Sequence, residues 1–218
     1  MRIYLIRHGQ TTGDVEDRYG GDYEDNLTKE GIRQAEELAN QLADRKIEII
    51  FSSPRIRAQE TADILSRKFV AKKLILEDIR ERNHYGILTG MTKDEAGEKY
   101  PDQVKLLKNT KNTILGGEDY IIFGNRVKKT FEAILNSDYQ TVTIVSHGGP
   151  IRFIFREILR VGEIKIGDCA LAGRLVFSCA SHNSIFLVNS SPNFGSQIKT
   201  SNCNAFVIAG AANKMSKP

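Results

Sequence analysis

The sequence lacks the long apolar runs that a membrane span or a signal peptide requires. At the start of the chain, residues 3–6 form a short apolar stretch between two arginines. A spanning helix needs about 20 predominantly apolar residues, and a signal peptide needs an apolar core of about 7–15. We therefore expect a soluble protein of the cytoplasm that does not use a membrane as a partner.

Cysteine is also scarce. The three cysteines, Cys169, Cys179 and Cys203, are odd in number and lie in the C-terminal quarter of the chain. Their spacing matches neither a zinc-binding pattern nor a disulfide framework. We expect free thiols without a catalytic role.

Blocks of like charge are missing as well. The net charge is +4, from 31 Lys and Arg against 27 Asp and Glu, and the two signs are interspersed along the chain. A nucleic-acid footprint concentrates basic residues on one face or in one run. The charge balance therefore favours a site for small anions and no nucleic-acid partner.

What the chain does contain is an alternation of short β-type segments with helical patterns. Residues 3–6, 47–51 and 142–145 are β-branched or aromatic with little alternation, which is typical of strands buried on both faces. Helices are predicted from the N-cap Thr28 to Leu42, from Ser53-Pro54 onward, after the capping box of residues 92–95, over about 119–135, and over 150–159. This order predicts an α/β domain around a largely parallel sheet.

Two regions interrupt the alternation. Residues 79–117 form an excursion of short helix and loops, which is a suitable place for a lid. Near the end of the chain, segments 166–170, 181–185 and 201–206 each have the pattern of a turn that enters a strand. The sequence does not decide which of the three supplies the last strand of the sheet.

Two histidines directly follow predicted strands. His8 stands in "RHG" after the first strand, and His147 stands in "SHGG" after the strand of residues 142–145. Ligands bind outside the carboxyl ends of parallel strands, so both histidines are candidates for one crevice. The glycines that follow, Gly148 among them, leave backbone N–H groups free to face an anion, and Arg7 adds a fixed cation.

Arg57 strengthens this interpretation. It lies near the start of the helix after the second strand, where a helix N-terminus and an arginine together bind anions well. Each of these residues alone is ordinary, because a single histidine after a strand is usually structural. Their repetition at equivalent places favours a pocket for a dianion such as phosphate. A metal site is not expected, because no third ligand accompanies the two histidines.

Five blocks of the sequence match a known family. In chain order, "LIRHGQT", "LTKEGIRQA", "IIFSSPRIRAQETA", "GGEDY" and "VSHGGPIR" resemble the signature blocks of the histidine phosphatase superfamily. This family contains cofactor-dependent phosphoglycerate mutases and many small-molecule phosphatases. The resemblance implies a phosphoglycerate mutase-like fold, a three-layer α/β/α sandwich. We assign residues 1–190 to its catalytic domain, with the excursion at about 79–117, and residues 191–218 to a C-terminal tail of uncertain structure.

The resemblance also implies catalytic roles. His8 would be the nucleophile that forms a phosphohistidine. Arg7, Arg57, His147 and the N–H of Gly148 would surround the phosphoryl oxygens and offset charge in the transition state. A phosphate beside His147 would favour the cationic form of that ring.

Glu81, in "DIRERNHYG", would protonate the leaving oxygen and then act as the base that activates water. The acid of the relatives precedes a glycine by one residue fewer than Glu81 precedes Gly86, and an insertion around Asn83 would explain the difference. The neighbours Asp78 and Arg82 keep an alternative open, in which this segment is an exposed charged turn.

Four further positions are implied contacts of the substrate. Asp14 stands where the family commonly places asparagine, and Gly20 lies in "DRYGGDYEDNLTKEG", which aligns without a gap onto the mutase pattern. Tyr85 and Lys93 lie in "HYGILTGMTKDEAGEKY", which is similar to the substrate-binding stretch of phosphoglycerate mutases. Gln10, by contrast, replaces the glutamate that mutases usually carry.

Three functions follow from these patterns. The first is a phosphatase for small-molecule phosphomonoesters that needs no cofactor and no metal. The second is a phosphoglycerate mutase primed by 2,3-bisphosphoglycerate, and the third is a non-catalytic anion-binding module. Gln10, "GGED" and the lack of the paired arginines expected of mutases favour the phosphatase, whereas the stretch from Tyr85 to Lys93 favours the mutase. We predict the phosphatase; the sequence indicates neither its physiological substrate nor its oligomeric state.

Overall fold

Four parallel strands form one side of the sheet. The computed structural model describes residues 1–158, 173–179, 182–189 and 206–209, with side chains up to residue 158. These strands lie in the order β3-β2-β4-β1, with β3 at the edge, and pair in parallel throughout: β1 Arg2–Arg7, β2 Ile49–Ser52, β3 Lys72–Ile75 and β4 Thr141–Ser146. Three of them confirm strands predicted from the sequence, whereas β3 was not predicted, because its exposed lysines hide the strand pattern.

Three C-terminal strands extend the sheet beyond β1. They are β5 Gly173–Cys179, β6 His182–Asn189 and β7 Phe206–Ala209. The end of β1 pairs in parallel with β5, and its first part pairs antiparallel with β7. Of the three candidate segments for a last strand, the second runs into β6, the third leads into β7, and residues 166–170 lie outside the described residues.

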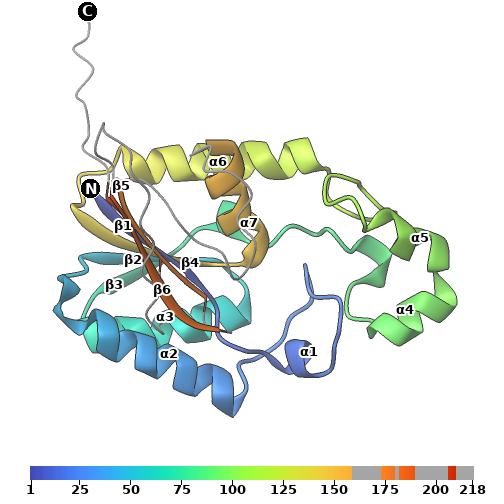
Figure 1. The fold of residues 1–218 in the computed structure, drawn as a ribbon, viewed down its shortest axis with the longest axis horizontal. Helices are drawn as coiled ribbons and strands as arrows, with labels where there is room; N and C mark the ends of the chain where they lie inside the picture. The colour runs from blue at the N-terminus through green and yellow to red at the C-terminus, as the bar shows by residue number, and fades with distance from the viewer. Residues whose placement is uncertain (159–172, 180–181, 190–205, 210–218) are drawn as a thin grey trace, which may run out of the picture.

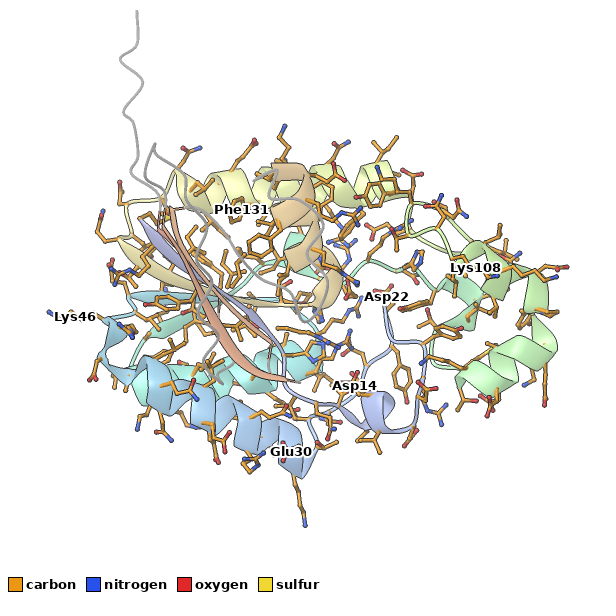
Figure 2. All side chains as sticks on the ribbon, in the orientation of Figure 1. Asp14, Asp22, Glu30, Lys46, Lys108 and Phe131 are labelled. Atoms are coloured by element: carbon orange, nitrogen blue, oxygen red, sulfur yellow. The ribbon has the colours of Figure 1, made fainter. Side chains whose placement is uncertain are left out.

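Helices cover both faces of the sheet, which confirms the predicted three-layer α/β/α sandwich (Figure 1). On one face lie α2 Lys29–Leu42 and α3 Ile56–Phe69, and on the other lie α6 Tyr120–Leu135 and α7 Gly148–Phe153. Side chains of β1 alternate between the two resulting cores: Ile3 and Leu5 pack with α6, while Tyr4 and Ile6 pack with α2 and α3. Figure 2 shows Phe131 between α6 and the sheet, in the first of these cores.

The predicted helix starts are confirmed at three places and wrong at a fourth. Thr28 caps α2, Asp119 caps α6, and the capping box of residues 92–95 opens α4 Lys93–Lys99. The helix predicted from Ser53-Pro54 instead begins at Ile56. Ser53 still belongs to the sheet edge, because its N–H continues the ladder to the carbonyl of Val145 at 2.9 Å.

The last predicted helix also differs from the expectation. It begins at Gly148 rather than after Pro150, and it passes after Phe153 into a π-helical turn, η4 Ile154–Ile158. The N–H of Ile151 already bonds to the carbonyl of His147, so the first turn starts directly at the end of β4. The predicted end at Leu159 lies outside the described residues.

The excursion of residues 79–117 packs around a small core of its own. It contains η3 Gly86–Leu88, α4 and α5 Pro101–Leu106, and it follows η2 Glu77–Ile79. Leu88, Ala96 and Ile114 are buried together there. The lid role and the domain boundary at residue 190 stay predictions. No helix in the described part of the chain is long and apolar enough to cross a membrane.

Candidate active site

The register of β1 and β4 brings the two predicted histidines together. Arg7 pairs with Ser146 in the parallel ladder, and the N–H of His8 bonds to the carbonyl of Ser146 at 3.1 Å. The residues that follow, His8 and His147, therefore leave the same edge of the sheet from adjacent strands. Their ring centroids lie 5.1 Å apart.

The ring of His8 has a defined orientation. Its Nδ1 lies 2.8 Å from the carbonyl oxygen of Gly9, which can only accept a hydrogen bond. We therefore assign the proton to Nδ1, which leaves the lone pair on Nε2. Burial lowers the pKa of His8 well below its usual value, and the charges of Arg7 and Arg57 lower it further.

His147 is fully buried beside it. Its Nε2 forms a hydrogen bond of 2.7 Å with Oγ of Ser53, and within the described part of the chain its Nδ1 has no hydrogen-bond partner. Burial lowers the pKa of His147 well below its usual value, with smaller effects of Arg57 and His8. Ser53 was not predicted as a site residue. It directly follows β2, the neighbour of β4, and this position could have identified it.

Arg57 is 3% exposed and lies near enough to both histidines for its charge to lower their pKa values. Its guanidinium donates to Oδ1 of Asp25 at 2.8 Å and to the carbonyls of Tyr23 and Gly21 at 2.6 and 3.0 Å. Arg57, which the sequence predicted to bind phosphate, thus lies near the histidines. Its guanidinium is bound to the segment of residues 21–25. Sequence reasoning missed Asp25, because the pair joins positions 32 residues apart.

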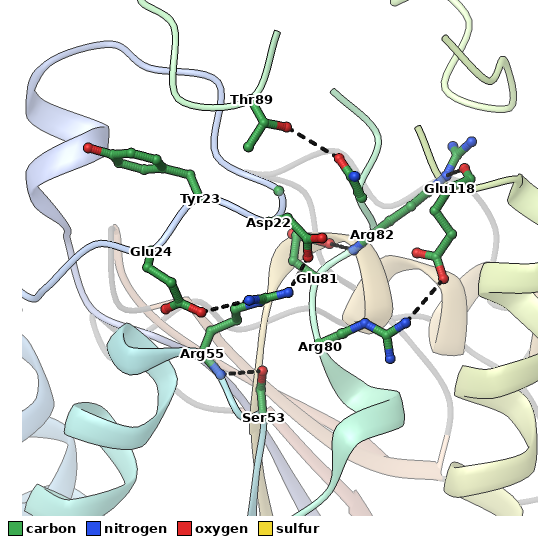
Figure 3. A network of polar contacts seen from close by, with 12 residues as sticks. Asp22, Tyr23, Glu24, Ser53, Arg55, Arg80, Glu81, Arg82, Thr89 and Glu118 are labelled. Carbon is green, nitrogen blue, oxygen red and sulfur yellow. Dashed lines mark hydrogen bonds and ion pairs between the residues drawn. The ribbon is translucent and has the colours of Figure 1, made fainter. Parts of the chain in front are cut away.

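The sequence predicted an anion site at the N-terminus of α3. In the structure, acidic side chains of the protein itself bind there. Glu24 accepts a hydrogen bond from the N–H of Ile56 at 3.0 Å and another from Nη1 of Arg55 at 2.7 Å. Arg55 also contacts Asp22 and lies between the two carboxylates (Figure 3). The segment of residues 20–25 therefore lies across this edge of the site.

Asp14 faces a cation of the site. Its Oδ1 lies 3.6 Å from Nη2 of Arg7, and its Oδ2 accepts the N–H of Thr11 at 3.0 Å in the capping box of α1 Thr12–Val15. Figure 2 shows Asp14 at α1 and Asp22 in the loop that follows, both between the sheet and the excursion that carries Lys108. An acid thus competes with an incoming anion for Arg7.

The carboxylate of Glu81 lies at the first turn of α7, the helix whose N-cap is His147. Both of its carboxylate oxygens accept the N–H of Gly149 at 3.1 Å, and Oε1 also accepts the N–H of Arg82 at 2.8 Å. A Cβ on Gly149 would stand 2.1 Å from Oε1 of Glu81, whereas one on Gly148 would meet nothing closer than 3.5 Å. The structure therefore brings Glu81 into the site, and the alternative of a merely exposed turn does not describe it.

The other predicted substrate contacts lie around the excursion. The ring of Tyr85 packs 4.9 Å from that of Tyr19, and burial raises the pKa of its hydroxyl. Nζ of Lys93 forms an exposed ion pair with Asp17. Gly20 has open space where a side chain would stand. Lys93 is therefore bound to the neighbouring loop rather than to the histidine pair.

Comparisons with known proteins agree with this geometry. The family model described as "Histidine phosphatase superfamily (branch 1)" matches residues 3–175. Phosphoserine phosphatase 1 of Hydrogenobacter thermophilus is 32% identical over 165 residues, which cover 74% of this chain and 77% of the relative. The metal-independent phosphoserine phosphatase of Arabidopsis thaliana is 29% identical over 180 residues, 80% of this chain and 72% of the relative.

A solved structure supports the same assignment. The alpha-ribazole phosphatase of Shigella flexneri superposes with a TM-score of 0.67 at 26% identity, and the match covers 75% of this chain and 81% of that one. The match of the family model and the similarity to phosphatases thus agree with the paired histidines at the sheet edge. The chain belongs to branch 1 of the histidine phosphatase superfamily.

Proposed function

We propose that this protein hydrolyses small-molecule phosphomonoesters through a phosphohistidine on His8. The observation that carries the proposal is the contact of His8 Nδ1 with the carbonyl of Gly9, 2.8 Å long, in a ring that lies beside His147. This contact assigns the proton to Nδ1 and leaves the lone pair of Nε2 available for attack. A neutral imidazole is the reactive form of a histidine nucleophile, and the lowered pKa of His8 keeps it neutral at physiological pH. The phosphatase names of the relatives support the same reaction.

In the first step, Nε2 of His8 attacks phosphorus and the ester P–O bond breaks. Glu81, in its protonated form, gives its proton to the leaving alcohol oxygen. Arg7, Arg57 and the N–H of Gly148 offset the charge on the phosphoryl oxygens. A phosphoryl group between the two rings also favours a proton on His147, against the effect of burial.

In the second step, water attacks the phosphohistidine. The carboxylate of Glu81 takes the proton of the water, the P–N bond breaks, and Nε2 recovers its lone pair. Products are alcohol and inorganic phosphate, and Glu81 is protonated again for the next cycle. Glu81 accepts the N–H of Gly149, two residues after His147. This position supports the use of Glu81 first as an acid and then as a base.

We further propose that the reaction uses no metal and no organic cofactor. Guanidinium groups already supply the positive charge that phosphoryl transfer requires. Phosphoserine and alpha-ribazole phosphate are the first substrates to test, given the names of the relatives. A cytoplasmic location and the lack of a nucleic-acid partner remain predictions.

Phosphorus NMR tests hydrolysis against the mutase alternative. The protein is given 3-phosphoglycerate with a trace of 2,3-bisphosphoglycerate, and in parallel O-phosphoserine. We expect inorganic phosphate to accumulate from at least one substrate. A 2-phosphoglycerate signal with little free phosphate would instead identify a mutase.

A phosphoenzyme assay tests the nucleophile. Denaturation during turnover should trap acid-labile phosphate on the wild-type protein and on the matched control His84→Ala, because His84 lies outside the proposed machinery. His8→Ala should lose both the label and turnover. Undiminished turnover of His8→Ala would refute the mechanism.

A further inference from the structure

The segment that carries Glu81 is held through its carbonyl groups by side chains of other elements. Oγ of Ser146, the last residue of β4, donates to the carbonyl of Ile79 at 2.7 Å. Arg126 of α6 donates to the carbonyls of Asp78, Arg80 and Glu81 at 2.7, 3.0 and 3.1 Å. Every carbonyl from residue 78 to residue 81 thus accepts a hydrogen bond from a side chain.

Arg126 uses its full set of donors in this arrangement. Besides the three carbonyls, it binds both carboxylate oxygens of Glu118, through Nε at 2.6 Å and Nη2 at 2.7 Å. A guanidinium has five N–H groups in a rigid plane, and here each of them has a partner. Arg126 is buried, so solvent does not compete strongly for these bonds.

Glu118 extends the same support to the other side of Glu81. Its backbone N–H donates to the carbonyl of Asn83 at 2.7 Å, and its own carbonyl accepts Nε of Arg82 at 3.0 Å. Its carboxylate also lies 3.8 Å from Nη2 of Arg80, as the dashed line in Figure 3 shows. Arg126 and Glu118 therefore bind the residues on both sides of Glu81 in the chain.

We propose that Arg126, together with Glu118, is a positioning residue that sets the carboxylate of Glu81 for proton transfer. This role rests on the proposed function, in which Glu81 is the general acid. A general acid must lie within hydrogen-bond reach of the leaving oxygen, and a misplacement of about 1 Å costs up to about a hundredfold in rate. Lysine cannot replace Arg126, because a single ammonium group cannot bind three carbonyls and a carboxylate in one plane.

The test compares two substrates that differ in their need for an acid. p-Nitrophenyl phosphate releases a stabilised phenolate without protonation, whereas glycerol 2-phosphate releases an alkoxide that must be protonated. In Arg126→Lys and Glu118→Gln we expect kcat/KM for glycerol 2-phosphate to fall about tenfold to a hundredfold more than kcat/KM for p-nitrophenyl phosphate. In a Glu81→Gln background, Arg126→Lys should add no further discrimination between the substrates, because both changes remove the same proton transfer.

Two further variants keep the test independent of folding. Ser146→Ala removes only the bond to the carbonyl of Ile79. It should also lower kcat/KM for glycerol 2-phosphate more than kcat/KM for p-nitrophenyl phosphate, but by a smaller factor. Arg33→Lys is the matched control, because Arg33 also binds both carboxylate oxygens of a glutamate, Glu30, but on the exposed face of α2. We expect it to leave both kcat/KM values unchanged.

The outcomes separate the two proposals. Equal losses on both substrates in Arg126→Lys and Ser146→Ala would mean a structural role and would overturn the positioning role alone. Discrimination that adds to that of Glu81→Gln would overturn it as well. If Glu81→Gln itself does not discriminate, the assignment of Glu81 as the acid fails, and the positioning role fails with it.

Discussion

Glu81 accepts the backbone N–H of Gly149 through both carboxylate oxygens, at 3.1 Å each. This contact joins the proposed acid to α7, the helix that begins at Gly148 and has His147 as its N-cap. A Cβ on residue 149 would stand 2.1 Å from Oε1 of Glu81, and the atom in its way is the end of a flexible side chain. We therefore expect Gly149→Ala to displace the carboxylate without unfolding the protein, and kcat/KM for an alkyl phosphate to fall about tenfold or more.

Gly97→Ala is the matched control for this substitution. A Cβ there would meet nothing within 4 Å, and alanine favours the helix α4 that contains it. Its kinetics should equal those of the wild type. Wild-type kinetics in Gly149→Ala would show that the contact between Glu81 and the N-terminus of α7 does not matter for turnover.

Asp14→Asn should strengthen the binding of phosphate and of orthovanadate. The carboxylate of Asp14 lies 3.6 Å from Nη2 of Arg7, so it offsets part of the charge that Arg7 can offer to an anion. Asparagine removes the charge but keeps an oxygen for the N–H of Thr11. An exposed ion pair of this kind contributes about 0.2–1 kcal/mol, so we expect the inhibition constant of either anion to fall by up to about fivefold.

The comparison for this change is Asp17→Asn. Asp17 also binds a cation, Lys93, but that pair is more exposed than the pair of Asp14 and Arg7 and joins the residues after α1 to the start of α4. The inhibition constants should not change there. Weaker inhibition of Asp14→Asn would mean that Asp14 helps to bind the anion, for example by orienting Arg7.

The part of the site that follows strands could be predicted from the sequence. Burial on both faces makes the strands of residues 3–6 and 142–145 recognisable, and parallel pairing then brings the next residues, His8 and His147, to one edge. The N-cap Thr28 and the start of a helix near Asp119 were also predictable, because capping is a local interaction.

The supporting contacts could not be predicted, because they join distant segments through side chains. Asp25 binds Arg57 across 32 residues, and Arg126 of α6 binds the carbonyls of Asp78, Arg80 and Glu81. Nothing in the local pattern around Arg126 distinguishes it from a solvated helix residue. The start of the helix after Pro54 was misplaced for a similar reason, since Ser53 bonds to Val145 of a strand far away in the chain.

Removal of metal ions should leave the activity unchanged. Arg7 and Arg57 supply positive charge near the two histidines. Unlike a bound metal ion, these side chains cannot be removed by a chelator. We therefore expect full turnover after dialysis against EDTA, with the assay repeated in the presence of excess chelator. Loss of activity that added Mg²⁺ or Zn²⁺ restores would contradict the proposed mechanism.

The titration of the histidines gives the sharpest check of the electrostatics. Burial lowers the pKa of His8 and of His147 well below the usual value near 6.5, and it lowers that of His84 to about 4. In NMR spectra, the ring signals of these three histidines should therefore have the shifts of neutral imidazole at about pH 6. A signal of His8 or His147 that titrates at the usual value or above would contradict this.

The same shifts predict how stability depends on pH. Because the folded-state pKa lies below the unfolded one, the unfolded chain binds more protons than the folded protein once the pH falls below about 6.5. The free energy of unfolding should therefore decrease as the pH is lowered from about 6.5 toward the folded-state values. Replacing His147 by Asn removes one of the groups that resist protonation in the fold. Thermal melts should accordingly show a smaller fall in Tm between neutral and acidic pH for His147→Asn than for the wild type, and an unchanged fall would mean that His147 takes up its proton in the folded protein at its ordinary pKa.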